Sequence, residues 1–167
     1  MTVKRITKCA VLAVIAVIAG IIENMLPPLF PFAPGVRLGL ANVVITFALV
    51  TQGLTSASIV LVIKIILVAL FSGNIGSLLY SAPAGIISLT VSFIGLRLLV
   101  PKISVITVSC AAAITHNAVQ LTVASIIAGA NLAAILPLTL IASVIAGYGV
   151  GLIVYFAVKK MPKRFLD

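Results

Sequence analysis

Residues 103–158 read ISVITVSCAAAITHNAVQLTVASIIAGANLAAILPLTLIASVIAGYGVGLIVYFAV, which is 56 residues without Asp, Glu, Lys or Arg. A helix needs about 20 mostly apolar residues to cross the hydrocarbon core of a membrane. This block is therefore too long for one span and long enough for two. Gly129, Ala130 and Asn131, with Pro137 following, interrupt the block and predict a helical hairpin at that point.

The rest of the chain repeats this pattern, with uncharged blocks at residues 9–22, 38–63 and 65–96. We predict one domain over residues 1–167, an all-α integral membrane protein with a bundle of six transmembrane helices. Gln52 and Gly53 divide the second helix from the third. The predicted helices cover about 6–26, 37–51, 55–71, 83–99, 103–128 and 135–158. The second helix is short, so five spans plus a re-entrant segment is the alternative.

The first apolar run follows Lys4, Arg5 and Lys8, as the hydrophobic part of a signal peptide would. It continues to Leu26, however, and ends in two prolines with no typical small-residue cleavage site nearby. We therefore expect a retained first helix.

The composition limits the chemistry of the protein. Of 167 residues, 63% are hydrophobic and 8% are charged, against about 25% charged residues in soluble domains. The acidic residues are Glu23 and Asp167, which excludes paired-carboxylate catalysis and carboxylate metal cages. Cys9 and Cys110 are far apart and lack metal-ligand spacing. We expect no catalytic residues, no metal site, no cofactor and no enzymatic activity.

The basic residues lie beside the apolar blocks. Lys and Arg accumulate in cytoplasmic loops of membrane proteins, and nine of the eleven fall on one side of the predicted topology. These nine are Lys4, Arg5, Lys8, Arg97, Lys102, Lys159, Lys160, Lys163 and Arg164. We predict a multi-pass protein of the cell membrane with both termini cytoplasmic. The charges also favour contact with anionic membrane lipids and form no continuous patch for nucleic acid.

Polar residues inside a bilayer are costly and usually face a bundle interior or a cavity. We predict that such residues line a polar pocket opening toward the outer face: Glu23, Arg37, Asn42, Lys64, His116, Asn117 and Gln120. His116 and Gln120 share a helix face at spacing i,i+4, with Asn117 close by. For these three residues, contact with a ligand and hydrogen bonding between helices both remain open.

Lys64 is predicted near the middle of the membrane, where an unpaired ammonium costs at least about 2.5–3.5 kcal/mol. Glu23 could pair with Lys64 or with Arg37 across the outer loop. In the second case Lys64 must be deprotonated, hydrated or matched by an anionic ligand, unless it snorkels to an interface. The local excess of one positive charge favours a neutral or anionic ligand.

Two loops border the predicted pocket. Residues 27–35, PPLFPFAPG, are stiff and apolar, and would form a lid or lie at the membrane interface. Residues 72–81, SGNIGSLLYS, are small and hydroxyl-rich, and we expect Asn74 and Tyr80 of this segment to cap the pocket. The segment lacks the GxxxxGK[ST] pattern of a phosphate loop.

Small residues mark two surfaces for close helix approach. Ala13, Ala16 and Gly20 lie at near-helical spacing in the first helix and predict a docking strip for a partner subunit, with packing inside the same bundle as the alternative. Gly147, Gly149 and Gly151 predict a second close-approach site.

Several of these motifs carry a family resemblance. The segment Pro34–Asn42, PGVRLGLAN, follows Glu23 and the prolines, and residues 72–81 and His116-Asn117-x-x-Gln120 accompany it. Together they resemble the Gx transporter family, often labelled heptaprenyl diphosphate synthase component I. This family is similar to the S components of energy-coupling factor transporters. The resemblance implies a six-helix subunit that binds a small solute near its outer face, with a transmembrane coupling protein and ATPase subunits as partners.

Three functions are therefore considered. The first is the substrate-binding subunit of an energy-coupling factor-type uptake transporter for an unidentified small solute. The second is a noncatalytic membrane subunit associated with heptaprenyl diphosphate (quinone) synthesis or with flavin-linked extracellular electron transfer. The third is a stand-alone carrier with Glu23 or His116 as its proton site. The molecules that copurify with the protein would separate the first two, and dependence of uptake on a proton gradient would indicate the third.

Overall fold

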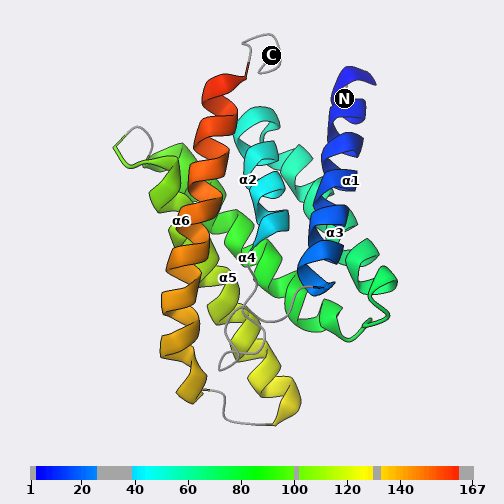
Figure 1. Cartoon of the computed structure of the whole chain (residues 1–167), viewed down its shortest axis with the longest axis vertical. Helices are drawn as coiled ribbons and strands as arrows, with labels where there is room; N and C mark the ends of the chain where they lie inside the picture. The colour runs from blue at the N-terminus through cyan, green and yellow to red at the C-terminus, as the bar shows by residue number, and fades with distance from the viewer. Residues whose placement is uncertain (1–2, 26–38, 100–101, 130–132, 162–167) are drawn as a thin grey trace.

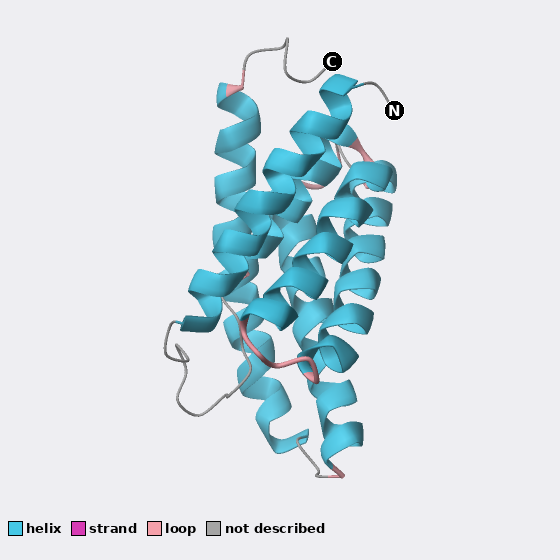
Figure 2. Ribbon diagram, turned by 90° about the vertical axis from the view of Figure 1, so that its right-hand side faces the viewer, coloured by secondary structure: helices cyan, strands magenta, loops and turns pink. Residues whose placement is uncertain are grey.

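The computed structural model describes residues 3–25, 39–99, 102–129 and 133–161. These residues form an up-and-down helical bundle (Figure 1, Figure 2). Its elements are α1 (Val3–Met25), α2 (Leu40–Gln52), α3 (Leu54–Phe71), α4 (Ser77–Leu98), α5 (Val105–Ala128), a short 3-10 turn η1 (Ala133–Ile135) and α6 (Leu136–Lys160). The prediction of an all-α membrane protein with six helices is confirmed.

Five of these helices, α1, α3, α4, α5 and α6, are long and apolar enough to cross a membrane. The exception is α2, whose 13 residues rise about 20 Å, less than the roughly 30 Å hydrocarbon core. The second predicted span is thus a short helix, which agrees with the five long spans of the alternative prediction. The start of α1 and the end of α6 lie at one end of the bundle (Figure 1), which we call the basic end because Lys4, Arg5, Lys8, Lys159 and Lys160 lie there.

The start of α4 differs from the prediction. We expected a helix from residue 83 and a flexible segment before it, but α4 begins at Ser77 and contains Pro83. The side-chain oxygen of Asn74 accepts a hydrogen bond from the backbone amide of Ser77 at 3.1 Å, which satisfies one of the free donors at a helix start. The turn therefore comprises residues 72–76, and Pro83 is accommodated inside a helix that is already established.

The helices pack as two halves, α1–α3 and α4–α6. Within them α1 packs on α2 and α3, and α5 packs on α4 and α6, while α2 meets α6 and α3 meets α4 between the halves. The main apolar cluster belongs almost entirely to the first half, with Leu89 from α4 as an addition. Most buried polar side chains belong to the second half, among them Ser92, Ser109, His116, Asn117, Gln120, Thr139 and Ser143.

The small residues of α1 are buried in its own bundle. Ala13 and Ala16 are part of the apolar cluster shared with α2 and α3. A Cβ atom on Gly20 would lie 2.8 Å from Cγ2 of Val68, so α1 and α3 approach closely at this glycine. These three residues form no exposed docking strip in the structure, and packing against α2 and α3 accounts for their small size.

Glycines also set the contact between α5 and α6. A Cβ atom on Gly147 would lie 2.6 Å from Cα of Cys110, and one on Gly151 would lie 2.6 Å from Cα of Ile106. A Cβ atom on Gly149 would meet nothing within 4 Å. The predicted close approach is confirmed for Gly147 and Gly151 and wrong for Gly149, which points away from α5.

Candidate functional site

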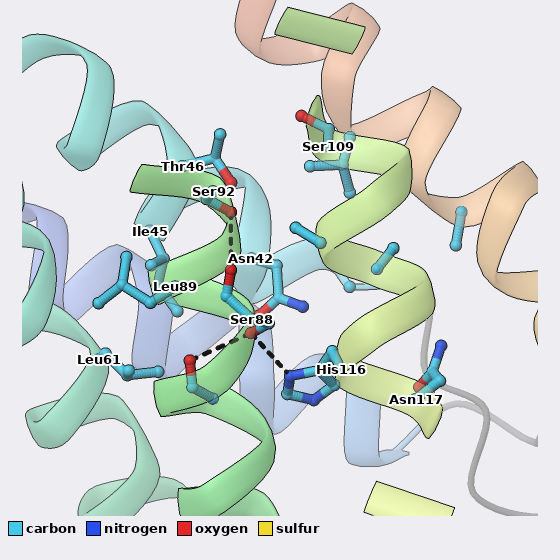
Figure 3. Close-up of a pocket in the computed structure, with 16 residues that line it drawn as sticks. Asn42, Ile45, Thr46, Leu61, Ser88, Leu89, Ser92, Ser109, His116 and Asn117 are labelled. Atoms are coloured by element: carbon cyan, nitrogen blue, oxygen red, sulfur yellow. Dashed lines mark hydrogen bonds between the residues drawn. The ribbon is translucent and has the colours of Figure 1, made fainter. Parts of the chain in front are cut away.

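A polar cavity of about 40 Å³ lies where the two halves meet (Figure 3). All six helices except α1 contribute to its lining. Its polar lining residues are Asn42, Thr46, Ser88, Ser92, Ser109, His116 and Asn117. Its other lining residues are Gly39, Ile45, Leu61, Gly85, Leu89, Ala112, Ala113, Ala146 and Val150. The cavity has room for a few water molecules or a group of similar size.

His116 and Ser88 connect α5 to α4 at this cavity. His116 Nδ1 lies 3.3 Å from the Ser88 hydroxyl oxygen, and Figure 3 shows the imidazole ring turned toward Ser88. The Ser88 hydroxyl oxygen also lies within hydrogen-bond distance of the carbonyl of Gly85, at 3.1 Å. A serine hydroxyl has one proton, so Ser88 can donate it either to the Gly85 carbonyl or to His116 Nδ1, and the tautomer of His116 decides which of the two residues donates in their bond.

Two further serines line the cavity. Ser92 donates its hydroxyl proton to the carbonyl of Ser88 at 3.0 Å. Ser109 on α5 is 3% exposed, and its hydroxyl oxygen makes no hydrogen bond to any described residue. A buried hydroxyl without a protein partner is uncommon in native proteins, and a bound polar group or water is the usual explanation. The buried hydroxyl of Ser109 is therefore the clearest indication that a polar group or a water molecule binds in this cavity.

Asn117 has a different role from that of His116. Its side-chain amide donates a 2.7 Å hydrogen bond to the Ser143 hydroxyl on α6, and Ser143 donates to the carbonyl of Thr139 at 2.5 Å. This short chain of bonds holds α5 to α6. Asn117 lines the cavity, yet its amide nitrogen serves the contact between helices.

Gln120 lies one turn from His116 on α5 and is 7% exposed. It does not line the cavity. Its side-chain oxygen makes no hydrogen bond to a described residue.

Glu23 is linked to the cavity by one hydrogen bond to the backbone of a lining residue. Its carboxylate accepts a hydrogen bond from the amide of Gly39, and Gly39 lines the cavity just before α2. Gly39 has φ of 77°, a conformation that favours glycine. Arg37 and the predicted lid at residues 27–35 lie outside the described residues.

Lys64 is buried at 6% exposure but does not line the cavity. Its aliphatic chain lies against α1, since a Cβ atom on Gly20 would be 3.4 Å from Cε of Lys64. Such burial is unlike a side chain that snorkels along the lipid surface. The structure thus places Lys64 between α1 and α3, apart from Asn42 and His116.

Asn74 and Tyr80 also lie apart from the cavity. Asn74 is exposed and caps the start of α4, and Tyr80 is half-buried in the first turns of that helix. Neither residue is part of the cavity lining. Of the nine predicted site residues, the structure therefore brings Asn42, His116 and Asn117 together at the cavity, with Glu23 one hydrogen bond away.

The sequence analysis missed four hydroxyl residues of the lining: Thr46, Ser88, Ser92 and Ser109. Helical spacing would have found two of them. Thr46 lies four residues after Asn42, and Ser109 lies seven before His116. Each of these pairs occupies one helix face, so a search for hydroxyls in register with the rarer polar residues would have selected Thr46 and Ser109. Ser88 and Ser92 lie four residues apart on α4 and have no rarer polar residue in register with them.

Among the described residues that line the cavity there is no Lys, Arg, Asp or Glu. Among the described residues there is also no group of three or more His, Cys, Asp and Glu residues that could hold a metal ion. The cavity instead offers hydrogen-bond donors and acceptors from hydroxyl, amide and imidazole groups. Such a site recognises small polar groups through hydrogen bonds.

A family model described as heptaprenyl diphosphate synthase component I matches residues 12–157 of the chain. No curated protein and no solved structure matches it. The matched region extends from α1 to the last turns of α6 and includes every residue that lines the cavity. The chain, a multi-pass membrane protein, therefore belongs to the heptaprenyl diphosphate synthase component I family.

Proposed function

We propose that this protein is the solute-binding membrane subunit of an uptake transporter, and that its cavity takes a small uncharged polar solute or the polar end of a larger one. The observation that carries the proposal is the buried hydroxyl of Ser109, which lines the cavity and makes no hydrogen bond to a described residue. A membrane bundle without a ligand would gain by filling such a position with an apolar side chain.

The hydrogen-bonding pattern supports an uncharged solute. The lining contains an imidazole at His116, an amide at Asn42 and a hydroxyl at Ser109, and these groups supply both hydrogen-bond donors and acceptors. A hydroxyl or amide group of the solute can donate hydrogen bonds to these side chains and accept hydrogen bonds from them. A fully charged solute would meet no opposite charge among the described residues of the lining, which makes its transfer from water costly.

The size of the cavity indicates that binding involves a more open form. About 40 Å³ is small beside the roughly 300–1,000 Å³ of typical ligand pockets. The cavity lies between the two halves, so a small separation of α2 and α3 from α4 and α6 would enlarge it. The described form corresponds to a closed bundle.

The direct test is mass spectrometry of small molecules that copurify with the detergent-solubilised protein. We expect a solute in the wild type that is lost from the Ser88→Ala/His116→Ala double variant. Thr90→Ala is the matched control, because Thr90 is an exposed hydroxyl residue of α4 that bonds only to its own helix at Ile86. Equal solute content in all three proteins would overturn the proposal.

Uptake also needs a source of energy, and we propose a transmembrane coupling protein with ATPase subunits. Affinity purification from native membranes tests this point separately. Recovery of ATPases supports the transporter subunit. Solute binding without ATPases, together with uptake that collapses with the proton gradient, would instead favour a carrier in which His116 or Glu23 exchanges a proton.

The family description favours a second function, a membrane subunit associated with prenyl diphosphate synthesis. A synthase active site holds Mg²⁺ and diphosphate with carboxylates. This chain has two acidic residues, Glu23 and Asp167, and Glu23 bonds to the Gly39 amide. These residues do not fit such a site, so any role in synthesis would be noncatalytic. Copurification of a prenyl diphosphate synthase or a flavoprotein, without ATPases, would support it.

A further inference from the structure

A groove of about 490 Å³ lies at the basic end of the bundle, away from the polar cavity. It is formed by the first turns of α1, the last turns of α2 and Met161 after α6. Figure 1 shows the ends of these three helices together at the top of the bundle. The volume lies within the range of ligand-binding pockets.

The walls of this groove are mostly apolar, although Gln52 adds a buried side-chain oxygen that makes no hydrogen bond to a described residue. Val11, Leu12 and Phe47 contribute hydrocarbon surface. The two threonines of the lining bond to their own helices: Thr7 donates to the carbonyl of Val3 at 3.1 Å and Thr51 to that of Phe47 at 2.8 Å. Their hydroxyls are therefore satisfied, and the groove offers an apolar surface suited to a hydrocarbon chain.

Among the described residues that line the groove, the charged side chains are all basic. Lys4 and Lys8 line the groove and lie one turn apart on α1, on the same helix face. The neighbouring Arg5 is directed elsewhere, because its guanidinium donates to the carbonyl of Gln52 and to the Ser56 hydroxyl. The groove thus combines an apolar trough with two ammonium groups at the end of the membrane spans, where lipid headgroups lie.

We propose that this groove is a binding site for one anionic phospholipid, with its acyl chain along α1 and α2 and its phosphate between Lys4 and Lys8. Anionic lipids are attracted to basic residues near the membrane surface, and the attraction is worth roughly a five-fold change in binding per lysine. The proposal concerns a different site from the solute cavity and does not depend on its function.

Fluorescence quenching tests the proposal, because the chain contains no tryptophan. A Phe47→Trp variant places a single reporter in the groove wall. The reporter is reconstituted in vesicles of phosphatidylcholine and phosphatidylglycerol, with brominated acyl chains on one lipid at a time. We expect roughly 5- to 25-fold stronger association of phosphatidylglycerol than of phosphatidylcholine.

Matched variants separate a site from general attraction to a basic surface. Lys4→Gln/Lys8→Gln in the Phe47→Trp background should abolish the preference, whereas Arg97→Gln/Lys102→Gln, which removes the same charge elsewhere, should retain it. A Leu98→Trp reporter, exposed beside Arg97, should show little preference. Equal quenching by both lipids, retention of the preference without Lys4 and Lys8, or the same preference at the Leu98 position would each overturn the proposal.

Discussion

At the scale of single residues, the rare polar side chains of the spans divide into two roles that the sequence could not distinguish. His116 is turned into the cavity, whereas the amide of Asn117 is bonded to Ser143 on α6. The two are adjacent in sequence and nearly equally buried. Their difference arises from the 100° turn between successive helix positions, which directs one toward α4 and the other toward α6.

Asn117 is therefore expected to act mainly on stability. Asn117→Ala removes the hydrogen bond to Ser143 and should lower the free energy of unfolding by about 0.6–2 kcal/mol. Thermal unfolding in detergent measures the change. Thr115→Ala is the control, because Thr115 bonds only to its own helix at Ala111. A stability equal to that of the wild type would contradict the role assigned to this bond.

Glu23 allows a test of charge against hydrogen bonding. Its carboxylate accepts the Gly39 amide, and glutamine retains an acceptor oxygen without the charge. We expect Glu23→Gln to preserve the start of α2 and Glu23→Ala to loosen it, with faster amide hydrogen exchange at residues 39–43. If Glu23→Gln is as disruptive as Glu23→Ala, the charge itself is needed, and an ionic partner for Glu23 becomes the better explanation.

The cost of placing a polar group in a membrane predicts that Asn42 and His116 face the interior of the bundle, and both line the cavity. The same argument applies to Lys64, yet Lys64 lies between α1 and α3. The free-energy cost of exposing a polar side chain to lipid indicates that the residue is buried. It does not indicate which helix the residue packs against. The serines were missed for the opposite reason. A serine in a helix can donate its hydroxyl proton to a carbonyl of its own helix. Its burial in a membrane therefore costs little free energy, and its presence in the sequence does not indicate a cavity.

At the scale of helices, Gly147 and Gly151 predict the sharpest effects. Alanine at either position brings a Cβ atom within 2.6 Å of the α5 backbone, so α5 and α6 must separate. We expect a loss of about 1–3 kcal/mol for each substitution. Gly149→Ala, in the same helix, should be neutral or slightly stabilising because alanine favours the helix. Unfolding in detergent compares the three, and equal effects would contradict the glycine-mediated packing of α5 on α6.

Charge and glycine patterns predicted most helix boundaries closely, and the exception is α4. Pro83 and the hydroxyl-rich segment before it indicated a loop, but the cap by Asn74 starts the helix at Ser77. Proline removes one backbone hydrogen bond from a helix, and its ring clashes with the carbonyl one turn before it. The cap by Asn74 starts the helix at Ser77, six residues before Pro83, so the helix is already established where the proline occurs.

At the scale of the whole molecule, the division into halves provides a route for opening the cavity. A Cβ atom on Gly85 of α4 would lie 2.9 Å from Cδ1 of Leu61 on α3, so cysteines at these two positions lie within reach of a short bifunctional cross-linker that is cleaved by reduction. In a background with Cys9 and Cys110 replaced by alanine, we expect the cross-link to slow solute exchange strongly. The reduced form of the same variant is the control, and equal exchange before and after reduction would place the opening elsewhere.

The sequence could not predict this division. Six apolar helices with weak differences between their faces are compatible with many arrangements in lipid, since apolar side chains satisfy either a lipid or a helix neighbour. The basic residues and an even number of helices predicted that both ends of the chain lie on one side, and the start of α1 and the end of α6 do lie at one end of the bundle (Figure 1). Which helix faces pack together instead depends on close contacts at glycines, such as Gly20 against Val68 and Gly151 against Ile106. These contacts can be recognised only once the helices are placed together.

The separation of an apolar cluster in α1–α3 from the buried polar groups of α4–α6 also bears on how the protein is made. Chains are synthesised from the N-terminus, and early segments can associate before later ones emerge. The first three helices contain almost the whole apolar cluster, so they can pair while the ribosome is still translating. Because α6 contributes Ala146 and Val150 to the lining, the cavity can be completed only after the last helix has been synthesised.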